Sequence, residues 1–259
     1  MAGSRGRWSP RERLLRASGL RLIAGVDEVG RGPLAGPVVA CAVVMPPDAR
    51  AIAGVADSKR LTAAERTRLA VHIRRRAVAL GLGAASVREI DRLNIYHATV
   101  LAMRRALARL GVTPEHVLVD GKPLRTLGVE HTAVVGGDDA CYSIACASIV
   151  AKVTRDRLMT ALGGRYPAYA WDHNVGYGTP EHRRGLDAAG LTPHHRRSFA
   201  PVGQLALDLV LPACGADPIA PLVAAGASEA ASTAALPLDL VAARRSCDAE
   251  PLHADPDAP

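Results

Sequence analysis

The sequence predicts an α/β domain built around a mixed sheet, and three observations predict it. Short apolar runs rich in valine have the length of buried strands. Between them lie longer segments in which apolar residues recur every three or four positions, as they do on one face of a helix. Glycine, proline and helix-capping residues mark the ends of both kinds of segment. Their order is β-β-α-β-α-β-β-α, which is typical of a single sheet covered by helices.

The first half of the predicted domain contains three strands and one helix. Residues 22–29 and 38–44 are expected to form two strands joined by a tight segment rich in glycine and proline. A capping box, Thr62-x-x-Glu65, opens a helix. The expected apolar stripe of this helix is Leu69, Ile73, Ala77 and Leu80. A third strand is expected within residues 77–87.

The second half alternates strands and helices again. An amphipathic helix is expected near residues 95–110, because its apolar residues follow a 3, 4, 3 spacing. Two short buried strands are expected over residues 117–119 and 132–135, and a long helix over residues 142–162. The segment Thr179-Pro180-Glu181 combines a capping residue, a proline and an acid, which together predict the start of one more helix.

The two ends of the chain differ in composition from the domain. Residues 1–20 carry five arginines and little apolar periodicity, so we expect a basic extension with room for one short helix. Residues 213–259 are rich in alanine and proline and carry seven acids against two bases. This composition predicts a disordered acidic tail. The α/β domain is therefore expected over residues 21–212.

Several classes of protein are excluded by composition. No apolar stretch approaches the ~20 residues that a membrane-spanning helix needs, and the N-terminus lacks the apolar core of a signal peptide. The five cysteines are scattered and form no C-x-x-C pair, which argues against a disulfide framework or a cysteine zinc site. We therefore expect a cytoplasmic protein with no membrane partner.

The charge of the chain indicates a polyanionic partner. The formal net charge is +7, from 32 basic and 25 acidic residues, and the acidic tail leaves the domain more basic than this average. Nucleic acid is the simplest partner for such a surface. Only three of the basic residues are lysines, namely Lys59, Lys122 and Lys152. Either chance or a need for a compact ammonium group explains why lysine was kept at these positions.

Carboxylates follow three of the predicted strands. Asp27-Glu28, Asp120 and Asp138 each stand at or just after the end of an apolar run, and in open α/β sheets ligands bind at that edge. Taken singly, each acid could be a solvated turn residue or a helix cap. Taken together, they predict a site for Mg²⁺ or Mn²⁺, which prefer oxygen ligands. Asp27 and Glu28 point to opposite faces of a regular strand, so they can share a site only if the strand ends or bulges there.

Two further features point to nucleic acid. In Gly30-Arg31-Gly32 the glycines allow close backbone approach and the arginine offers a forked donor to phosphate, although a plain turn is the simpler interpretation. Four of the eight aromatic residues fall between positions 166 and 177. We interpret three of them as packing residues. Tyr177 is the candidate for stacking, because glycines flank and expose it.

At this point the sequence resembles the ribonuclease HII family, the type 2 bacterial ribonucleases H. Residues 23–38 read IAGVDEVGRGPLAGPV and resemble the signature segment of that family. The other matching blocks are Asp57-Ser58-Lys59, Val119-Asp120-Gly121, Gly137-Asp138, residues 143–156, Gly176-Tyr177-Gly178-Thr179 and His195-Arg196-Arg197-Ser198-Phe199. The resemblance covers roughly residues 20–203, and its blocks keep the family order and approximate spacing.

The resemblance implies a ribonuclease H-like fold, with a five-stranded mixed sheet flanked by helices and a helical C-terminal extension. It implies an endonuclease that hydrolyses the RNA strand of RNA–DNA hybrids, and also DNA duplexes containing single ribonucleotides, by two-metal-ion catalysis that leaves 5′-phosphate and 3′-hydroxyl ends. The implied cofactor is Mn²⁺ or Mg²⁺. The implied metal-binding and catalytic residues are Asp27, Glu28, Asp120 and Asp138.

The same resemblance implies how substrate is read. Gly30, Arg31 and Gly32 would contact the ribonucleotide 2′-hydroxyl, and Tyr177 would stack on the following deoxyribose. We take Lys59, Lys152 and Arg155 as candidates for phosphate contacts. The sequence departs from the family at Gly136, where a lysine usually precedes the Gly-Asp pair. The neighbouring Asp139 therefore stays open as an alternative to Asp138.

Two rival functions remain open at this stage. One is a related metal-dependent nuclease or recombinase that acts on plain or branched DNA, and the other is a hybrid-binding module without catalysis. Equal cleavage of an all-DNA duplex would favour the first, and binding without turnover in Mn²⁺ would favour the second. The expected oligomeric state is a monomer.

Overall fold

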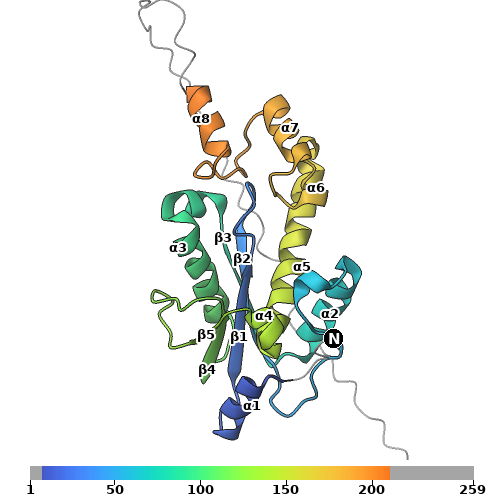
Figure 1. The fold of residues 1–259 in the computed structure, drawn as a ribbon, viewed down its shortest axis with the longest axis vertical. Coiled ribbons are helices and arrows are strands. Elements are labelled where there is room, and N and C mark those ends of the chain that lie inside the picture. The colour runs from blue at the N-terminus through green and yellow to red at the C-terminus, as the bar shows by residue number, and fades with distance from the viewer. Residues whose placement is uncertain (1–7, 211–259) are drawn as a thin grey trace, which may run out of the picture. The chain divides into compact units, whose positions relative to one another are not determined.

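A five-stranded mixed sheet forms the centre of residues 8–210, the part of the chain that this computed structural model describes (Figure 1). The strand order is β3-β2-β1-β4-β5. The strands are β1 (Ile23–Val29), β2 (Val38–Val44), β3 (Ala79–Ala85), β4 (His116–Asp120) and β5 (Thr132–Val134). β1, β4 and β5 run parallel to one another, whereas β2 is antiparallel to both β1 and β3. The predicted fold class is therefore confirmed, and all five predicted strands lie in this one sheet.

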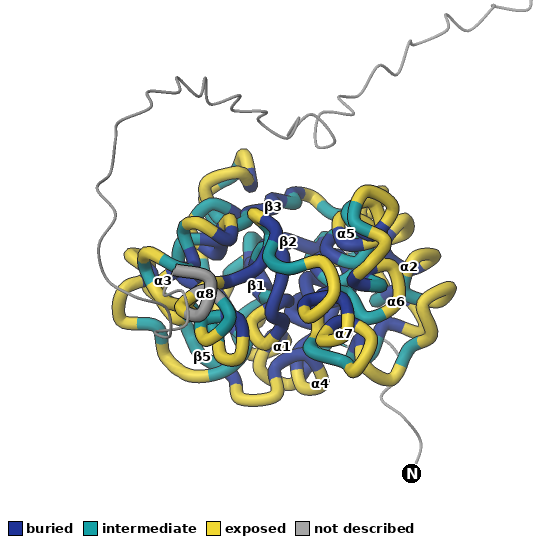
Figure 2. Tube along the Cα trace, turned by 90° about the horizontal axis from the view of Figure 1, so that it is seen from above, coloured by how far each residue is buried: buried dark blue, intermediate teal, exposed yellow. Residues whose placement is uncertain are grey.

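Helices cover both faces of this sheet, with α3 (Val87–Ala108) on one side and α5 (Tyr142–Arg165) on the other (Figures 1 and 2). Successive side chains of β2 point to opposite faces of the sheet, and this alternation explains how β2 contributes to the cores on both faces. Its even-numbered residues from Val38 to Val44 pack in the core under α3, while its odd-numbered residues pack with α5 and with α2 (Ala63–Arg76). All seven residues of β2 are buried because the strand is covered on both faces.

A smaller core lies at the C-terminal end of α5. The short helices η2 (Pro167–Tyr169) and α6 (Trp171–Asn174) follow α5, and α7 (Pro180–Ala189) and α8 (Val202–Val210) complete the described chain. Their buried residues pack with Leu34, Ala35 and Met159. This helical extension is therefore anchored on the loop between β1 and β2, which carries the Gly-Arg-Gly segment.

The chain before β1 contains one helix, α1 (Pro10–Ala17), which begins with a capping box formed by Ser9 and Glu12. It lies inside the predicted basic extension. The predicted acidic tail, residues 213–259, lies outside the described residues. Within the described residues, no helix is both long and apolar enough to cross a membrane.

The helix predictions need three corrections. α2 ends at Arg76, so Ala77 and Leu80 do not extend its apolar stripe, and Leu80 belongs to β3. α3 begins at Val87, eight residues before the predicted start, and bends at Asn94, where the backbone leaves helical geometry (φ 67°, ψ 168°). A short helix, α4 (Gly137–Ala140), was not expected.

Candidate active site

Asp27 and Glu28 lie where one edge of β1 becomes free. β1 pairs with β2 in regular register through Val29, but its pairing with β4 ends at Val26. No bulge is needed, because the strand has already lost its neighbour on the β4 side when it reaches the two acids. Asp27 stands opposite Cys41, on the face covered by α5, and it is only 5% exposed.

Two contacts fix the Asp27 carboxylate. It accepts a hydrogen bond from the main-chain N–H of Glu28 at 2.7 Å and another from the hydroxyl of Ser148 on α5. The Ser148 hydroxyl is itself 2.9 Å from that of Ser58, and both serines are buried. A short chain of hydroxyl groups therefore lies behind the carboxylate.

Asp120 and Asp138 reach the same edge from β4 and α4. Asp120 is the last residue of β4, and its Oδ1 accepts a hydrogen bond from the N–H of Gly137 at 2.6 Å. An added Cβ at 137 would lie 2.6 Å from a terminal methyl group of the buried Ile144 and 3.2 Å from that Oδ1, so a side chain there would force Ile144 to shift. The next residue, Asp138, is therefore held beside Asp120.

The structure separates Asp138 from its neighbour Asp139. Asp138 is 8% exposed, and its Oδ2 accepts a hydrogen bond from Lys59 Nζ at 3.1 Å. The Asp139 side chain is 64% exposed and lies 3.8 Å from Arg60. Only Asp138 faces the other carboxylates, since its charge also acts on Asp120.

Neighbouring negative charge disfavours the ionised form of three of the carboxylates, Asp27, Glu28 and Asp120. Burial raises the pKa of Asp27 well above its usual range, and the charges of Glu28 and Asp120 raise it further. Burial also raises the pKa of Glu28, although the adjacent Arg31 opposes this shift. For Asp120, burial raises the pKa and Asp138 adds to the effect. A bound cation would offset this repulsion and favour the ionised form of the carboxylates.

The donor set suits hard divalent cations. All four side chains offer carboxylate oxygens, which Mg²⁺ and Mn²⁺ prefer, and Lys59 is the one cation bonded to them besides Arg31. In residues 8–210, however, no three acidic, histidine or cysteine side chains already surround a single point as ligands. Metal binding by these carboxylates would therefore require side-chain movement or further oxygen ligands from water or substrate.

The Gly30-Arg31-Gly32 segment begins the loop that leaves β1, and a buried arginine holds it. Arg196, which is fully buried, donates to the carbonyl oxygens of Gly30 at 2.5 Å, Arg31 at 2.8 Å and Gly36 at 2.7 and 3.0 Å. The Arg31 side chain is 54% exposed and pairs with Glu28 at 3.2 Å. This loop therefore presents its backbone beside the carboxylates in a fixed conformation.

Tyr177 lies against the same loop. Its ring is the nearest group to Gly32, where an added Cβ would lie 3.6 Å from the ring, and the residue is 47% exposed. The adjacent Gly176 carbonyl accepts hydrogen bonds from Leu34 and Ala35 of the loop. By contrast, Tyr169 and Trp171 are buried, which confirms that they are packing residues.

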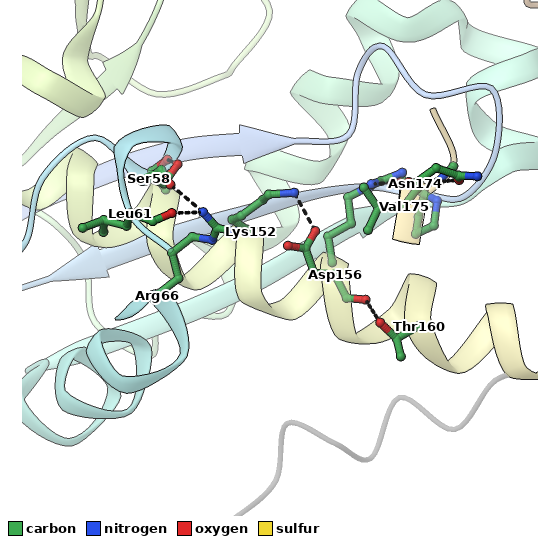
Figure 3. A network of polar contacts seen from close by, with 12 residues as sticks. Ser58, Leu61, Arg66, Lys152, Asp156, Thr160, Asn174 and Val175 are labelled. Atoms are coloured by element: carbon green, nitrogen blue, oxygen red, sulfur yellow. Dashed lines mark hydrogen bonds and ion pairs between the residues drawn. The ribbon is translucent and has the colours of Figure 1, made fainter. Parts of the chain in front are cut away.

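The three predicted phosphate contacts have different outcomes. Lys59 is 81% exposed on the short helix η1 (Ser58–Arg60), and Arg66 holds this segment by donating to the carbonyls of Ser58 and Leu61 (Figure 3). Lys152 is partly exposed and is paired with Asp156 at 2.7 Å (Figure 3). Both lysines are therefore paired with a carboxylate, Lys59 with Asp138 and Lys152 with Asp156, and Lys59 is the more exposed of the two.

The prediction for Arg155 was wrong. The residue is fully buried in α5 and donates to the carbonyl oxygens of Pro37, Val175 and Ala35 at 2.9–3.1 Å. Burial lowers the pKa of its guanidinium to about 10. It cannot reach a phosphate, and instead it ties the β1–β2 loop to the segment before Tyr177. Gly30 has a positive φ of 93°, and an added Cβ would lie 2.1 Å from Arg155.

Sequence reasoning missed the supporting roles of Arg196 and Ser148. Neither residue carries a local signal, because each acts on a segment more than 100 positions away. The burial of Arg155 carried no sequence signal either, because its neighbours Thr154, Asp156 and Arg157 give this part of α5 the composition of a solvated surface.

The chain was then compared with known proteins. The family model described as Ribonuclease HII matches residues 24–202. The ribonuclease HII of Thermosynechococcus vestitus is 58% identical over 183 residues, which cover 70% of this chain and 85% of that protein. The ribonuclease HII of Granulibacter bethesdensis is 54% identical over 206 residues, which cover 78% of this chain and 94% of the relative.

Solved structures share the fold. The crystal structure of ribonuclease H2 from Pyrococcus horikoshii has a TM-score of 0.63 and 25% identity, and the match covers 73% of this chain and 98% of that chain. The structure of Bst-RNase HIII in complex with Mn²⁺ has a TM-score of 0.55 and 20% identity, covering 74% of this chain and 72% of that one.

Proposed function

This chain belongs to the ribonuclease HII family and is an endonuclease that cuts the RNA strand of RNA–DNA hybrids, and we propose how its residues perform that reaction. Asp27, Glu28, Asp120 and Asp138 bind divalent metal ions between them. The observation that carries this proposal is the set of four largely buried carboxylates at one edge of the sheet. Among the described residues, Arg31 and Lys59 are the cations that hydrogen-bond to them.

Divalent cations held by these carboxylates would supply Lewis acidity, which favours a water nucleophile near neutral pH and charge on the departing 3′-oxygen. The chain itself orients the ligands. Ser148 and the Glu28 amide hold Asp27, and the Gly137 amide holds Asp120, so that neither carboxylate rotates freely. Mn²⁺ is the first ion to test, since the related Bst-RNase HIII was solved in complex with it; Mg²⁺ is the alternative.

Substrate selection belongs to the Gly-Arg-Gly loop and Tyr177. The backbone of Gly30, Arg31 and Gly32 contacts the 2′-hydroxyl of the ribonucleotide beside the metal site, and the Tyr177 ring stacks on the next sugar. Because the ring packs on Gly32, the two contacts lie side by side. Together they favour cleavage at single ribonucleotides embedded in DNA as well as in longer hybrids. Lys59 binds a phosphate next to the scissile bond, and the enzyme acts as a cytoplasmic monomer.

The test uses duplexes labelled on the strand to be cut. We expect cleavage of an RNA–DNA hybrid and of a duplex with one ribonucleotide in the presence of Mn²⁺ or Mg²⁺, with 5′-phosphate products, and no cleavage after addition of a chelator. Asp120→Asn should lose most of this activity. An all-DNA duplex of equal length serves as the control. Cleavage of that duplex at a similar rate would instead support a general DNA nuclease.

A further inference from the structure

A buried glutamate in α1 touches the helix that carries part of the active site. Glu12 is fully buried, and its carboxylate accepts hydrogen bonds from the N–H groups of Ser9 at 2.9 Å, Tyr142 at 3.0 Å and Ser143 at 2.8 Å. The first contact closes the capping box of α1. The other two join α1 to a segment about 130 positions away, so local helix capping does not explain them.

These two amides begin α5. The residue at the N-cap of α5 is Cys141, whose side chain makes no capping hydrogen bond. The first amides of a helix need an acceptor when they are buried, and a negative charge is favoured at that end. Glu12 therefore supplies from α1 the cap that α5 does not provide for itself. Ser9 adds a contact from its hydroxyl to the Cys141 sulfur at 3.7 Å.

The segment that Glu12 caps is continuous with the carboxylate site. The N–H of Cys141 donates to the carbonyl of Gly137 at 2.7 Å, which closes the turn that contains Asp138. Further along α5, Ser148 donates to Asp27. A shift of the start of α5 would therefore move a candidate ligand and the donor that fixes another.

The packing of α5 on β1 leaves no space to absorb such a shift. An added Cβ on Gly25, two residues before Asp27, would lie 2.3 Å from the main-chain carbon of Ser143 and 2.5 Å from the nitrogen of Ile144. The cleft beside Asp138 is also lined by Trp8, Ser9 and Arg13, so residues of the α1 region form one wall of it. α1 is thus placed to set the geometry of the site.

We propose that Glu12 is a positioning residue for the metal-binding carboxylates, so that α1, which precedes the family match at residues 24–202, is part of the active-site scaffold. This inference rests on the proposed function. In this proposal Glu12 contacts neither metal nor substrate. It holds the main chain of Tyr142 and Ser143, and through them it fixes the turn before α5, which carries Asp138, and the part of α5 that carries Ser148.

The experiment compares Glu12→Ala and Glu12→Gln in the full chain with a matched control, Glu89→Ala. Glu89 occupies the same capping-box position in α3, on the opposite face of the sheet, and contacts Ser86 and Arg105 only. Three quantities are measured: Mn²⁺ affinity of the substrate-free protein by electron paramagnetic resonance, kcat and KM on the duplex with one ribonucleotide, and the melting temperature.

We expect Glu12→Ala to weaken Mn²⁺ binding and lower kcat by about 10- to 100-fold, the usual effect of removing a group that orients metal ligands, with a smaller change in KM. Glu12→Gln keeps one acceptor oxygen and should fall between the alanine variant and the wild type. Glu89→Ala should lower the melting temperature without changing Mn²⁺ affinity.

Wild-type Mn²⁺ affinity and kcat in the Glu12 variants would overturn the positioning role, even if their melting temperature falls. If Glu12→Ala does not fold, Glu12→Gln decides in the same way. The proposed function fails separately. A wild-type protein without metal-dependent cleavage refutes that function, whatever the Glu12 variants do. If the wild type is active and Asp27→Asn is inactive, the proposed function stands, and the Glu12 variants then test the positioning role alone.

Discussion

Asp27 combines burial with like charge, and this makes it costly to the folded protein when no metal is bound. It is 5% exposed, and both Glu28 and Asp120 disfavour its ionised form. The asparagine side chain has nearly the same shape, and its carbonyl oxygen can still accept a hydrogen bond from Ser148. Replacing Asp27 by asparagine therefore separates the electrostatic role of the carboxylate from its packing.

We predict that Asp27→Asn raises the melting temperature of the metal-free protein. It should also lower the cleavage rate by on the order of 100-fold or more, because removing a group that only hydrogen-bonds to a metal ligand already lowers activity by about 10- to 100-fold. Calorimetry in the presence of a chelator and a duplex cleavage assay with Mn²⁺ check the two parts. Ser198→Ala, which removes a hydrogen bond to Asp91 and touches none of the four carboxylates, is the control. A variant that loses stability and keeps its rate would contradict both parts.

Tyr177 is exposed by its glycine neighbours but held by the backbone around it. Its carbonyl contacts His182 Nδ1 at 2.9 Å, and its ring rests on Gly32. We predict that Tyr177→Ala lowers the preference for a ribonucleotide followed by DNA over a continuous hybrid by about tenfold, because a stacking contact contributes about 1–3 kcal/mol. Tyr177→Phe should keep the preference. The ratio of kcat/KM on the two substrates is the measurement, and an unchanged ratio in the alanine variant would remove Tyr177 from substrate selection.

At the scale of elements, the strands were predictable and the helix ends were less so. β1 and β2 are short apolar runs with turn residues on both sides, and β2 was placed to the residue. The first two turns of α3 were missed although Ser86 and Glu89 form a capping box. Only Val87 and Ile90 are buried before the bend at Asn94, which is too short a stripe to show a helical period.

The loop between β1 and β2 could not be predicted in its details, because its conformation is imposed from elsewhere. Arg155 and Arg196 come from α5 and from the segment after α7, and both donate to its carbonyl groups. Burial lowers the pKa of Arg196 to about 9, and the charge of Arg155 adds to the shift. Two buried guanidinium groups therefore replace the regular hydrogen bonds that this loop lacks.

We predict that Arg196→Lys raises KM for the duplex and lowers the free energy of unfolding by about 3 kcal/mol, because an ammonium group cannot reach the three carbonyls that the guanidinium fork reaches and is left buried with too few acceptors. Substrate titrations and chemical denaturation give the two values. Arg184→Lys, at an exposed position on α7, is the matched control. Unchanged KM with lowered stability would mean that the loop does not depend on Arg196 for its shape.

At the scale of the whole molecule, the topology explains why the carboxylates could be predicted. β1, β4 and β5 are parallel, so their C-terminal ends lie at the same edge of the sheet. Acids that follow these three strands must therefore meet, however far apart they stand in the sequence. This rule does not decide between Asp138 and Asp139. In the structure Asp138 is the more buried of the two and directly follows Gly137, whose N–H bonds to Asp120.

The pH dependence of stability also belongs to the whole molecule, because two buried clusters act with opposite sign. Burial raises the pKa of Asp27, Glu28 and Asp120, so without metal the folded state takes up protons more readily than the unfolded chain and these groups favour folding as pH falls. In the helical extension the pKa of His195 is lowered to about 3, mainly by burial and in smaller part by the charges of His182 and His194. This group stays neutral when folded, so it favours unfolding as pH falls.

The histidine contribution can be isolated by difference. His195 is 1% exposed and packs against Trp171 and His182, so the folded state protonates it only near its lowered pKa. Its stabilising effect is complete above the unfolded pKa of about 6.5 and is lost by about 1.4 kcal/mol for each pH unit below that value, down to the folded pKa. Relative to His195→Asn, the wild type should therefore lose about 2 kcal/mol of unfolding free energy between pH 6.5 and pH 5.

Denaturation curves of the two proteins at several pH values, with chelator present, give this difference directly. The carboxylate cluster is the same in both proteins, and the hydrogen bonds of His195 go to Thr192 and His182 rather than to the cluster, so its opposite contribution cancels in the difference. A difference that does not vary with pH would mean that His195 is already protonated in the folded protein or that it is accessible to water. In that case the lowered pKa of His195 would be wrong, and so would the conclusion that water is excluded from the core of the helical extension that supports Tyr177.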